Sequence, residues 1–339
     1  MKARKIAALL AAGALTLAAC SNGDADGEDT GSDAGTAAAS DGDANSGSNG
    51  DDSDIRIAMV THGDGGSFWS VAKRGAEDAA SAEGVTLDYQ ESNNDPQQQA
   101  QLIEAAVSAG VQGIAVSVPN PDAIRDALQQ ATDAGIPIVT LNSGSTVYQE
   151  FGAITHVGQD EEIAGAGAGQ QLADAGGTKL LCVIHEQNNV GLQSRCAGAR
   201  ETFGGEVEDF QVTGTADPTQ TANEIAAKLQ ADSSIDSVLA LNPDIAMAAV
   251  EAVDTAASEA NLATFDLSGD VVSAIEAGDI LFAVDQQQYL QGYLPVVFLK
   301  LFNTNANTVG GGLPVNTGPG FVTQENAATV AELAQSGTR

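Results

Sequence analysis

From residue 55 onward, short apolar runs alternate with stretches in which apolar residues recur at helical spacing. The helical spacing is seen, for example, at Leu102, Ile103, Ala106 and Val107. Near-continuous apolar strands joined by helices predict parallel sheets covered on both faces, in an α/β fold. The predicted strands are Ile55–Val60, Val85–Tyr89, Gly113–Val118, Pro137–Leu141, Ala153–Val157, Lys179–His185, Val207–Val212, Ser237–Leu241, Leu262–Phe265 and Leu281–Val284.

Four predicted helices share one start signal, a side-chain oxygen followed by proline: Asp95-Pro96, Asn120-Pro121, Asp217-Pro218 and Asn242-Pro243. The first residue of each pair is a good N-cap, and proline suits the first helical position. Each pair follows the carboxyl end of a strand. Ligands of open α/β sheets bind beside those ends. The loops expected to form a site are therefore 61–67, 117–120, 142–145, 186–195, 242–244, 266–269 and 285–288.

The N-terminus places three basic residues before the apolar run 6–19, as in a segment that directs export. The run is short for a membrane span. It ends in Leu17-Ala18-Ala19-Cys20, which resembles the lipobox of bacterial lipoproteins. The resemblance implies that residues 1–20 are a signal peptide, and that Cys20 carries lipid and anchors the protein to the outer face of the bacterial cell membrane. An ordinary cleaved signal is the alternative.

Residues 21–54 are almost entirely small, polar or acidic, and we expect a disordered tether because little apolar surface is available for burial. As a flexible coil, such a segment spans about 30 Å. The 285 residues that follow (339 less 54) are too many for one ordinary core and suit two lobes.

Acidic residues dominate the chain. Without the three basic residues of the signal, 10 of the 13 Lys and Arg face 46 Asp and Glu. Phosphate backbones would be repelled, so nucleic acid is not expected as a partner.

Cys182 and Cys196 are the two cysteines that remain when Cys20 is lipidated. An oxidising extracellular face favours a disulfide between them. A metal site of Cys182, His185 and Cys196 is the competitor, but three ligands at this spacing match no familiar zinc pattern. We expect the disulfide and no metal.

Motifs of several enzyme classes are missing: the chain contains no G-x-x-x-x-G-K-[ST], no H-E-x-x-H and no G-x-S-x-G. Gly63-Asp64-Gly65-Gly66-Ser67 follows a strand, but it lacks the lysine of a phosphate-binding loop and contains a carboxylate. The glycines of Gly165-Ala166-Gly167-Ala168-Gly169 lack dinucleotide-binding spacing and suit close helix packing. We therefore expect neither a cofactor nor an enzyme.

Several segments together resemble the ribose-binding-protein-like family of type 1 periplasmic solute receptors. In the first half these are Ile55–Val60, Ser67-Phe68-Trp69, Gly113–Val116, Pro121–Ile124 and Ala134–Asn142. In the second half they are Arg195 with Gly198, Leu241–Met247, Thr264-Phe265-Asp266 and Ala283–Gln287. In this order they cover nearly everything from residue 55 to about residue 323.

The resemblance implies two similar doubly wound parallel-sheet lobes joined by a three-crossover hinge, with a monosaccharide, polyol or related molecule held between them. It places the crossovers near Gly158, Gln286 and Gly312. The N-terminal lobe then comprises residues 55–158 plus 286–312, and the C-terminal lobe residues 159–285 plus 313–339.

The resemblance also assigns ligand-binding residues. Phe68 and Trp69 look like the aromatic pair that packs on the apolar face of a sugar, and Arg195 like the arginine whose donors grip hydroxyl groups. The alternative for Phe68 is a place in the helix core, and the alternative for Arg195 is a surface salt bridge. The remaining polar candidates are His62, Ser117, Asn142, Asn242, Asp266 and Gln286.

Departures from the ribose pattern leave the sugar open. Asn142-Ser143 stands where that pattern has Asp-Arg, and Gly65-Gly66-Ser67 where it has Asn-Asn-Pro. Ala216 stands where an aromatic residue is often found, so one stacking face is missing or is supplied by Tyr289.

The expected function is that of a monomeric extracytoplasmic receptor that closes on its ligand about a hinge and delivers it to the permease of an ABC importer. The alternative is a receptor that reports a sugar-like signal to a membrane sensor. A secreted enzyme would alter its ligand. A sugar-responsive transcription regulator is contradicted by the export signal and by the lack of a helix-turn-helix.

Overall fold

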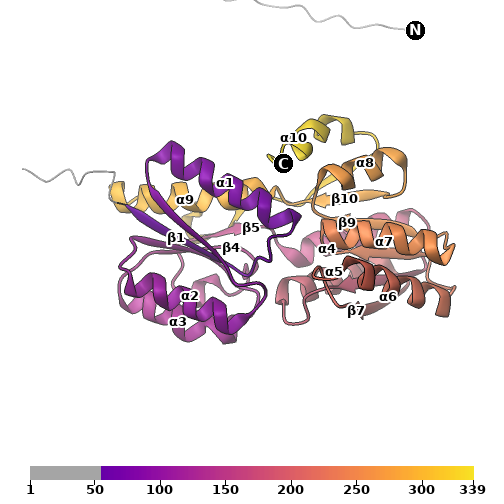
Figure 1. Cartoon of the computed structure of the whole chain (residues 1–339), viewed down its shortest axis with the longest axis horizontal. Coiled ribbons are helices and arrows are strands. Elements are labelled where there is room, and N and C mark those ends of the chain that lie inside the picture. Colours follow the sequence, from indigo (N-terminus) through magenta and orange to yellow (C-terminus); the bar gives the residue numbers. More distant parts are fainter. Residues whose placement is uncertain (1–54) are drawn as a thin grey trace, which may run out of the picture. The chain divides into compact units, whose positions relative to one another are not determined.

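The computed structural model describes residues 55–339. The predictions for the signal peptide, for Cys20 and for the tether lie outside the described residues. Two six-stranded sheets, each flanked by helices, form the framework of this part (Figure 1). The predicted fold class, two doubly wound α/β lobes, is confirmed.

The strand order of the first sheet is β11-β5-β4-β3-β1-β2, and that of the second is β12-β10-β9-β8-β6-β7. Apart from the short strands at one edge, both follow the 2-1-3-4-5 order of doubly wound folds. All pairs are parallel except β10 with β12. The strands are β1 Arg56–Thr61, β2 Thr86–Glu91, β3 Gly113–Ser117, β4 Ile138–Asn142, β5 His156–Gly158, β6 Lys179–Ile184, β7 Glu206–Gln211, β8 Ser237–Ala240, β9 Asn261–Phe265, β10 Phe282–Asp285, β11 Val315–Asn316 and β12 Gly320–Thr323.

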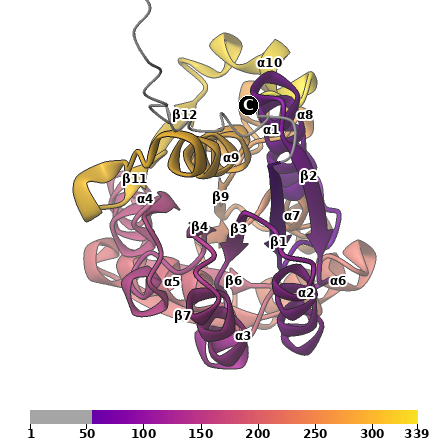
Figure 2. The ribbon, with the colours of Figure 1, turned by 90° about the vertical axis from the view of Figure 1, so that its left-hand side faces the viewer.

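Helices cover both faces of each sheet, as the apolar strands require. On the first sheet, α1 and α9 pack on one face, and α2 and α3 pack on the other (Figure 2). On the second, α4 and α5 face α6, α7 and α8 across the strands. The helices are α1 Ser67–Glu83, α2 Pro96–Ser108, α3 Pro121–Asp133, α4 Glu161–Asp174, α5 Val190–Phe203, α6 Pro218–Ala231, α7 Pro243–Ala256, α8 Gly269–Ala277, α9 Gln288–Asn305 and α10 Ala331–Gln335, with short 3-10 turns η2 Tyr148–Phe151, η3 Gly310–Gly312 and η4 Ala327–Thr329.

The four predicted helix starts are confirmed. Helices α2, α3, α6 and α7 each begin at a proline, and the preceding side chain accepts hydrogen bonds from backbone N–H groups of the first turn. These caps satisfy donors that a helix start leaves unpaired. They also fix the loops at the carboxyl ends of β2, β3, β7 and β8.

Glycines bring α4 and α5 close together. A Cβ atom added at Gly165 would collide with the carbonyl oxygen of Arg195, and one at Gly198 with that of Glu162. The prediction that the Gly165 run serves close helix packing is therefore confirmed. The contact places the start of α4 beside Arg195 on α5.

The chain passes between the sheets three times: after β5, after β10 and after β11. The third passage differs from the prediction. Val315 pairs with Val157 and Asn316 with Gly158, so residues 313–316 stay with the first sheet. The crossover lies at 317–319 rather than at Gly312, because two further residues add to the edge of that sheet before the chain leaves.

Candidate functional site

An inner cavity of about 30 Å³ lies where the carboxyl ends of β1, β4, β6, β8 and β9 converge from the two lobes. This position agrees with the rule for ligand sites of α/β sheets. The first lobe lines it with His62, Asp64, Gly66, Phe68, Trp69, Asn142 and Ser143, and the second with His185, Glu186, Asn189, Gly191, Leu192, Arg195, Leu241, Asn242, Asp244 and Asp266.

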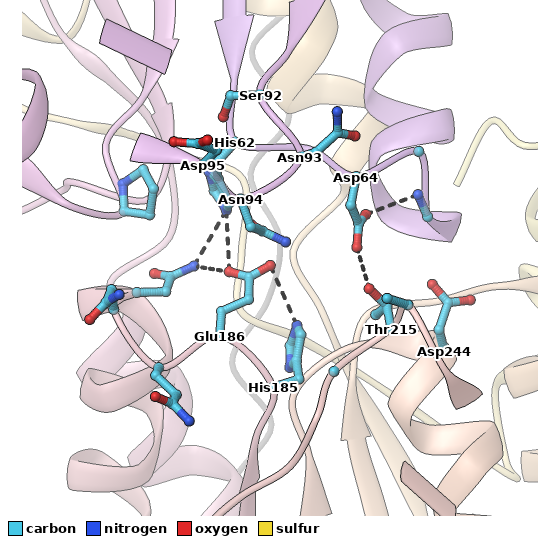
Figure 3. A pocket seen from close by; sticks show the side chains of 18 of the residues that line it. His62, Asp64, Ser92, Asn93, Asn94, Asp95, His185, Glu186, Thr215 and Asp244 are labelled. Atoms are coloured by element: carbon cyan, nitrogen blue, oxygen red, sulfur yellow. Dashed lines mark hydrogen bonds and ion pairs between the residues drawn. The ribbon is translucent and has the colours of Figure 1, made fainter. Parts of the chain in front are cut away.

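An outer cleft of about 970 Å³ adjoins the inner cavity on the side of β2 and β7 (Figure 3). Its walls come from the loops within 62–67, 92–96, 119–120, 185–189 and 213–218, together with Ser70, Gln99 and Asp244. His62, Asp64, Glu186, Asn189 and Asp244 line both spaces. The two spaces therefore share a wall.

Phe68 and Trp69 lie in the first turn of α1 and form the aromatic part of the inner wall. Their ring centroids are 4.9 Å apart at an interplanar angle of 77°, and the His62 ring stands edge-on to Trp69 at 4.8 Å. Both side chains are buried and also contact the core of the first lobe. Phe68 is thus both a core residue of the first lobe and a lining residue of the cavity. That Phe68 and Trp69 stack on a sugar stays a prediction.

Arg195 is 4% exposed on α5 and forms a two-pronged ion pair with Glu161 at the start of α4. Its Nε donates to Glu161 Oε2 at 2.7 Å, and its Nη2 donates to Oε1 at 2.9 Å. Its Nη1 donates to the carbonyl oxygen of Leu241 at 2.9 Å. Guanidinium has five N–H donors, so these three bonds leave two N–H groups for other partners, and Arg195 lines the inner cavity. The surface salt bridge weighed as an alternative is excluded by this burial.

Asp266 follows β9 and is 2% exposed. Its Oδ1 accepts a hydrogen bond from Gln286 Nε2 at 2.7 Å, and its Oδ2 lies 4.0 Å from Arg195 Nη1. Burial raises the pKa of Asp266 to about 7, although Arg195 and Gln286 act in the opposite direction. The carboxyl group is therefore poised between its neutral and charged forms near neutral pH.

His62 sits at the junction of the two lobes. Its Nδ1 is 2.7 Å from Ser117 Oγ, and its Nε2 is 3.3 Å from Asn189 Nδ2 of the second lobe. Burial lowers the pKa of His62 to about 3. The ring is consequently neutral and acts as a hydrogen-bonding group.

Two asparagines supply amides from opposite lobes. Asn142 ends β4 with a positive φ of 58°, and its Nδ2 donates to Gln291 Oε1 at 3.3 Å. Asn242 is the N-cap of α7, and its Oδ1 accepts from Ile245 N at 2.8 Å. The N-cap role predicted from Asn242-Pro243 is confirmed, and it leaves the Asn242 amide N–H groups available.

Ser117 and Gln286 do not line the inner cavity, in contrast to the prediction. Ser117 is fully buried, and its Oγ accepts from the backbone N–H of His62 and contacts the His62 ring. Gln286 is fully buried between Asp266 and Gln291. Both hold lining side chains in place. Tyr289 is also elsewhere: its hydroxyl donates to Asp78 and its ring stacks on Tyr293, so it offers the cavity no stacking face.

Among the residues that the structure brings to the site and that sequence reasoning missed are Asp64, Glu161, Glu186, Asn189 and Asp244. In the sequence, the carboxylate of Asp64 indicated only that its loop is not a phosphate-binding loop. Its loop and those of Glu186, Asn189 and Asp244 were expected to form the site, so position relative to the strands was the usable signal. Glu161 lies outside those loops, and no feature of the sequence indicated that it belongs to the site.

Cys182 on β6 and Cys196 on α5 form a disulfide, as predicted. The set Cys182, Cys196 and Asp209 is the single group of possible metal ligands found within residues 55–339. Its sulfur atoms are bonded to each other, so they are not thiolate ligands.

Comparison with known proteins identifies the family. The model for the periplasmic binding protein domain matches residues 57–302. The chain belongs to this family. Its relatives place it among the sugar-binding proteins of the ribose-binding type, as the sequence predicted.

A crystal structure of a carbohydrate transporter from Acidothermus cellulolyticus 11B, in complex with myo-inositol, is similar at 44% identity and a TM-score of 0.82. The match covers 84% of this chain and 100% of that one. The xylose/arabinose-binding protein of Sulfolobus acidocaldarius is 25% identical over 80% of this chain and 71% of its own. The xylitol-binding protein of Mycolicibacterium smegmatis is 27% identical over 82% and 74%.

Within residues 55–339, no helix is both long and apolar enough to cross a membrane.

Proposed function

We propose that this periplasmic binding protein captures a cyclic polyol or monosaccharide between its lobes and delivers it to an ABC importer without altering it. The observation that carries the proposal is one cavity walled by the Phe68–Trp69 pair from the first lobe and by Arg195 from the second. An aromatic face suits the C–H surface of a ring, and the amides and guanidinium suit its hydroxyl groups.

Myo-inositol is the first ligand to test, because the relative at 44% identity was crystallised with it. The departures from the ribose pattern at Asn142-Ser143 agree with a ligand other than ribose.

Binding requires the lobes to move. The inner cavity of about 30 Å³ is far below the roughly 300 Å³ at which small-molecule pockets begin. Hinge closure about a ligand is the motion known for periplasmic binding proteins. The three crossover segments contact one another here: Thr317 N donates to Gly158 O at 2.6 Å, and Gln287 Nε2 donates to Thr317 O at 2.6 Å. We propose these segments as the hinge.

Calorimetric titration of the full chain with myo-inositol, pentoses, hexoses and linear polyols tests the proposal. A ligand that binds also raises the melting temperature, because it stabilises the native state. Asn242→Asp should weaken binding by roughly tenfold, since it keeps the cap but replaces an amide donor with an acceptor. Asp217→Asn is the matched control: it changes the charge of an N-cap before proline at a residue that lines neither the inner cavity nor the outer cleft. Lack of binding by every sugar and polyol would overturn the proposal, as would chemical alteration of the ligand.

We propose further that Cys20 carries a lipid that holds the protein at the outer face of the cell membrane, on the strength of the Leu17–Cys20 motif. Metabolic labelling with a fatty acid should mark the wild-type protein and leave Cys20→Ala unmarked. Equal labelling of the two would exclude the anchor.

A further inference from the structure

The outer cleft has an acidic wall. Asp64, Asp95, Glu186 and Asp244 line it, whereas none of its lining residues is a lysine or an arginine. Figure 3 shows these carboxylates on both sides of the opening, from loops of both lobes. The two histidines of the wall do not offset the charge, because burial lowers the pKa of His62 to about 3 and also lowers that of His185. Within the described residues the cleft thus has four formal negative charges and no cation.

Neutral donors hold these carboxylates in place. Asp244 accepts from Ser67 Oγ at 2.6 Å, and Glu186 Oε2 accepts from Asn189 Nδ2 at 2.6 Å. Asp64 accepts from the hydroxyl of Thr215. Because these partners are uncharged, they orient the carboxylates without neutralising them.

Three buried polar atoms of the same wall have no hydrogen-bond partner among the described residues: Ser92 Oγ, Gln99 Oε1 and His185 Nδ1. Ser92 is 0% exposed and Gln99 1%. Gln99 Nε2 donates to the carbonyl oxygen of Ser117, which leaves its acceptor end unpaired. Buried polar groups are nearly always paired, so these three residues of the cleft wall have hydrogen-bonding capacity that no group among the described residues meets. All three can accept a hydrogen bond.

The opening beside the inner cavity is not closed by an aromatic ring. Ala216 lines the outer cleft at the place where the family often has an aromatic residue, and Tyr289 does not replace it. Because Asp64, Glu186 and Asp244 line both spaces, a substituent on a ring in the inner cavity would enter the acidic cleft.

We infer that the outer cleft is a second subsite, which takes an ammonium group carried by a ligand whose hydroxyl-bearing ring lies in the inner cavity. An ammonium group has three donors and no acceptor, which matches a wall of carboxylates and unpaired acceptors. A bare metal ion fits less well: within residues 55–339, the carboxylates of the cleft do not form a compact ligand set. The inference rests on the proposed function, because it requires a ring in the inner cavity.

The test is calorimetric titration of the full chain with three kinds of probe: myo-inositol, its amino-deoxy derivatives, and the N-acetyl forms of those derivatives. One or more amines should bind roughly tenfold tighter than myo-inositol and than their acetylated forms. The preference should shrink as salt rises. N-acetylation removes the positive charge and keeps a nitrogen substituent on the ring, so the comparison separates the effect of the charge from the effect of having a substituent.

Glu186→Gln and Asp95→Asn should each lower the ratio of amine affinity to myo-inositol affinity, the first more strongly because Glu186 is the more buried. Asparagine caps a helix as well as aspartate does, so Asp95→Asn leaves α2 intact. Asp126→Asn removes the same charge from the exposed face of α3 and should leave the ratio unchanged.

Each other outcome overturns a different statement. If myo-inositol binds and the amines bind no tighter, the ammonium subsite is wrong and the proposed function stands. If the N-acetyl forms bind as tightly as the amines, the cleft takes neutral substituents and the charge argument is wrong. If none of the polyols or sugars binds, the proposed function itself fails.

Discussion

Arg195 lines the inner cavity and also forms an ion pair with a buried carboxylate. Two of its N–H groups bind Glu161, which is also 4% exposed. Removal of one partner from a buried ion pair leaves the other charge without compensation, and that costs roughly 3 to 5 kcal/mol. From the sequence alone, Arg195→Ala is predicted to abolish the response to ligand and to spare the ligand-free protein. Because Arg195 is paired with Glu161, we no longer expect the stability of the ligand-free protein to be spared.

We expect Arg195→Ala to lower the free energy of unfolding of the ligand-free protein, measured in urea, and to abolish stabilisation by ligand. Arg195→Ala combined with Glu161→Ala should regain part of the lost stability, because the orphan carboxylate is gone, but should regain no binding. If the double variant is less stable than Arg195→Ala alone, the carboxylate is not the source of the loss.

Asp266 should make stability depend on pH. Its pKa is about 7 in the folded protein and lower in the unfolded chain, so the folded state holds a proton that the unfolded state releases. This contribution is fully present below the unfolded pKa and is lost as pH rises toward 7. We expect a fall of roughly 2 to 4 kcal/mol between pH 4 and pH 7 from this group.

Asp266→Asn should flatten this part of the pH profile in urea unfolding, whereas Asp126→Asn on the surface should leave the slope unaltered. An equal slope in wild type and Asp266→Asn would show that Asp266 titrates at an ordinary carboxyl pKa.

At the scale of elements, the disulfide ties α5 to β6 one residue beyond Arg195. It closes a loop with a sequence separation of 14, for which chain entropy predicts about 3 kcal/mol of stabilisation. We expect the double variant Cys182→Ala, Cys196→Ala to unfold at lower urea concentration by that amount. Because Arg195 is adjacent to Cys196, affinity for the ligand should fall as well. Unchanged affinity with reduced stability would show that the contact of α4 with α5 alone positions Arg195.

The elements themselves were largely predictable. All ten predicted strands exist, because buried parallel strands read as apolar runs, and the four helix starts carry their caps in the sequence. The two short strands β11 and β12 were missed because they lie in a segment rich in glycine and proline that has no apolar periodicity. They are held by pairing with β5 and β10, which is a property of the assembled sheets.

The sequence predicted where the candidate site lies better than it predicted which side chains bind one another there. The loops after the strands could be listed, and most of the candidate residues lie at the inner cavity. Local spacing says nothing about partners far apart in the chain, such as Ser67 with Asp244, 177 residues away, or Arg195 with Glu161. Ser117 and Gln286 lie behind the cavity wall because other side chains take up their polar atoms: His62, after β1, pairs with Ser117, and Asp266, after β9, and Gln291, on α9, pair with Gln286.

At the scale of the whole molecule, direct hydrogen bonds join the two lobes across the cleft. Asp244 of the second lobe accepts from both the N–H and the hydroxyl of Ser67, at 3.1 Å and 2.6 Å, and Ser143 Oγ donates to Asn189 Oδ1 at 3.2 Å. These bonds exist only while the lobes are together. They therefore stabilise a closed arrangement of the lobes and lower the free energy that binding must supply for closure.

Ser67→Ala removes one of these bonds and Ser70→Ala removes none, since Ser70 Oγ donates only to carbonyl oxygens of its own lobe. A hydrogen bond to a charged group contributes roughly 1.5 to 3 kcal/mol. We expect Ser67→Ala to bind myo-inositol or the best polyol found at least several-fold more weakly, and Ser70→Ala to bind as wild type does. Small-angle scattering should give Ser67→Ala a larger radius of gyration without ligand and the wild-type value at saturation, because ligand contacts then outweigh the missing bond. Equal scattering and affinity for the two variants would mean that Ser67 and Asp244 do not hold the lobes together in solution.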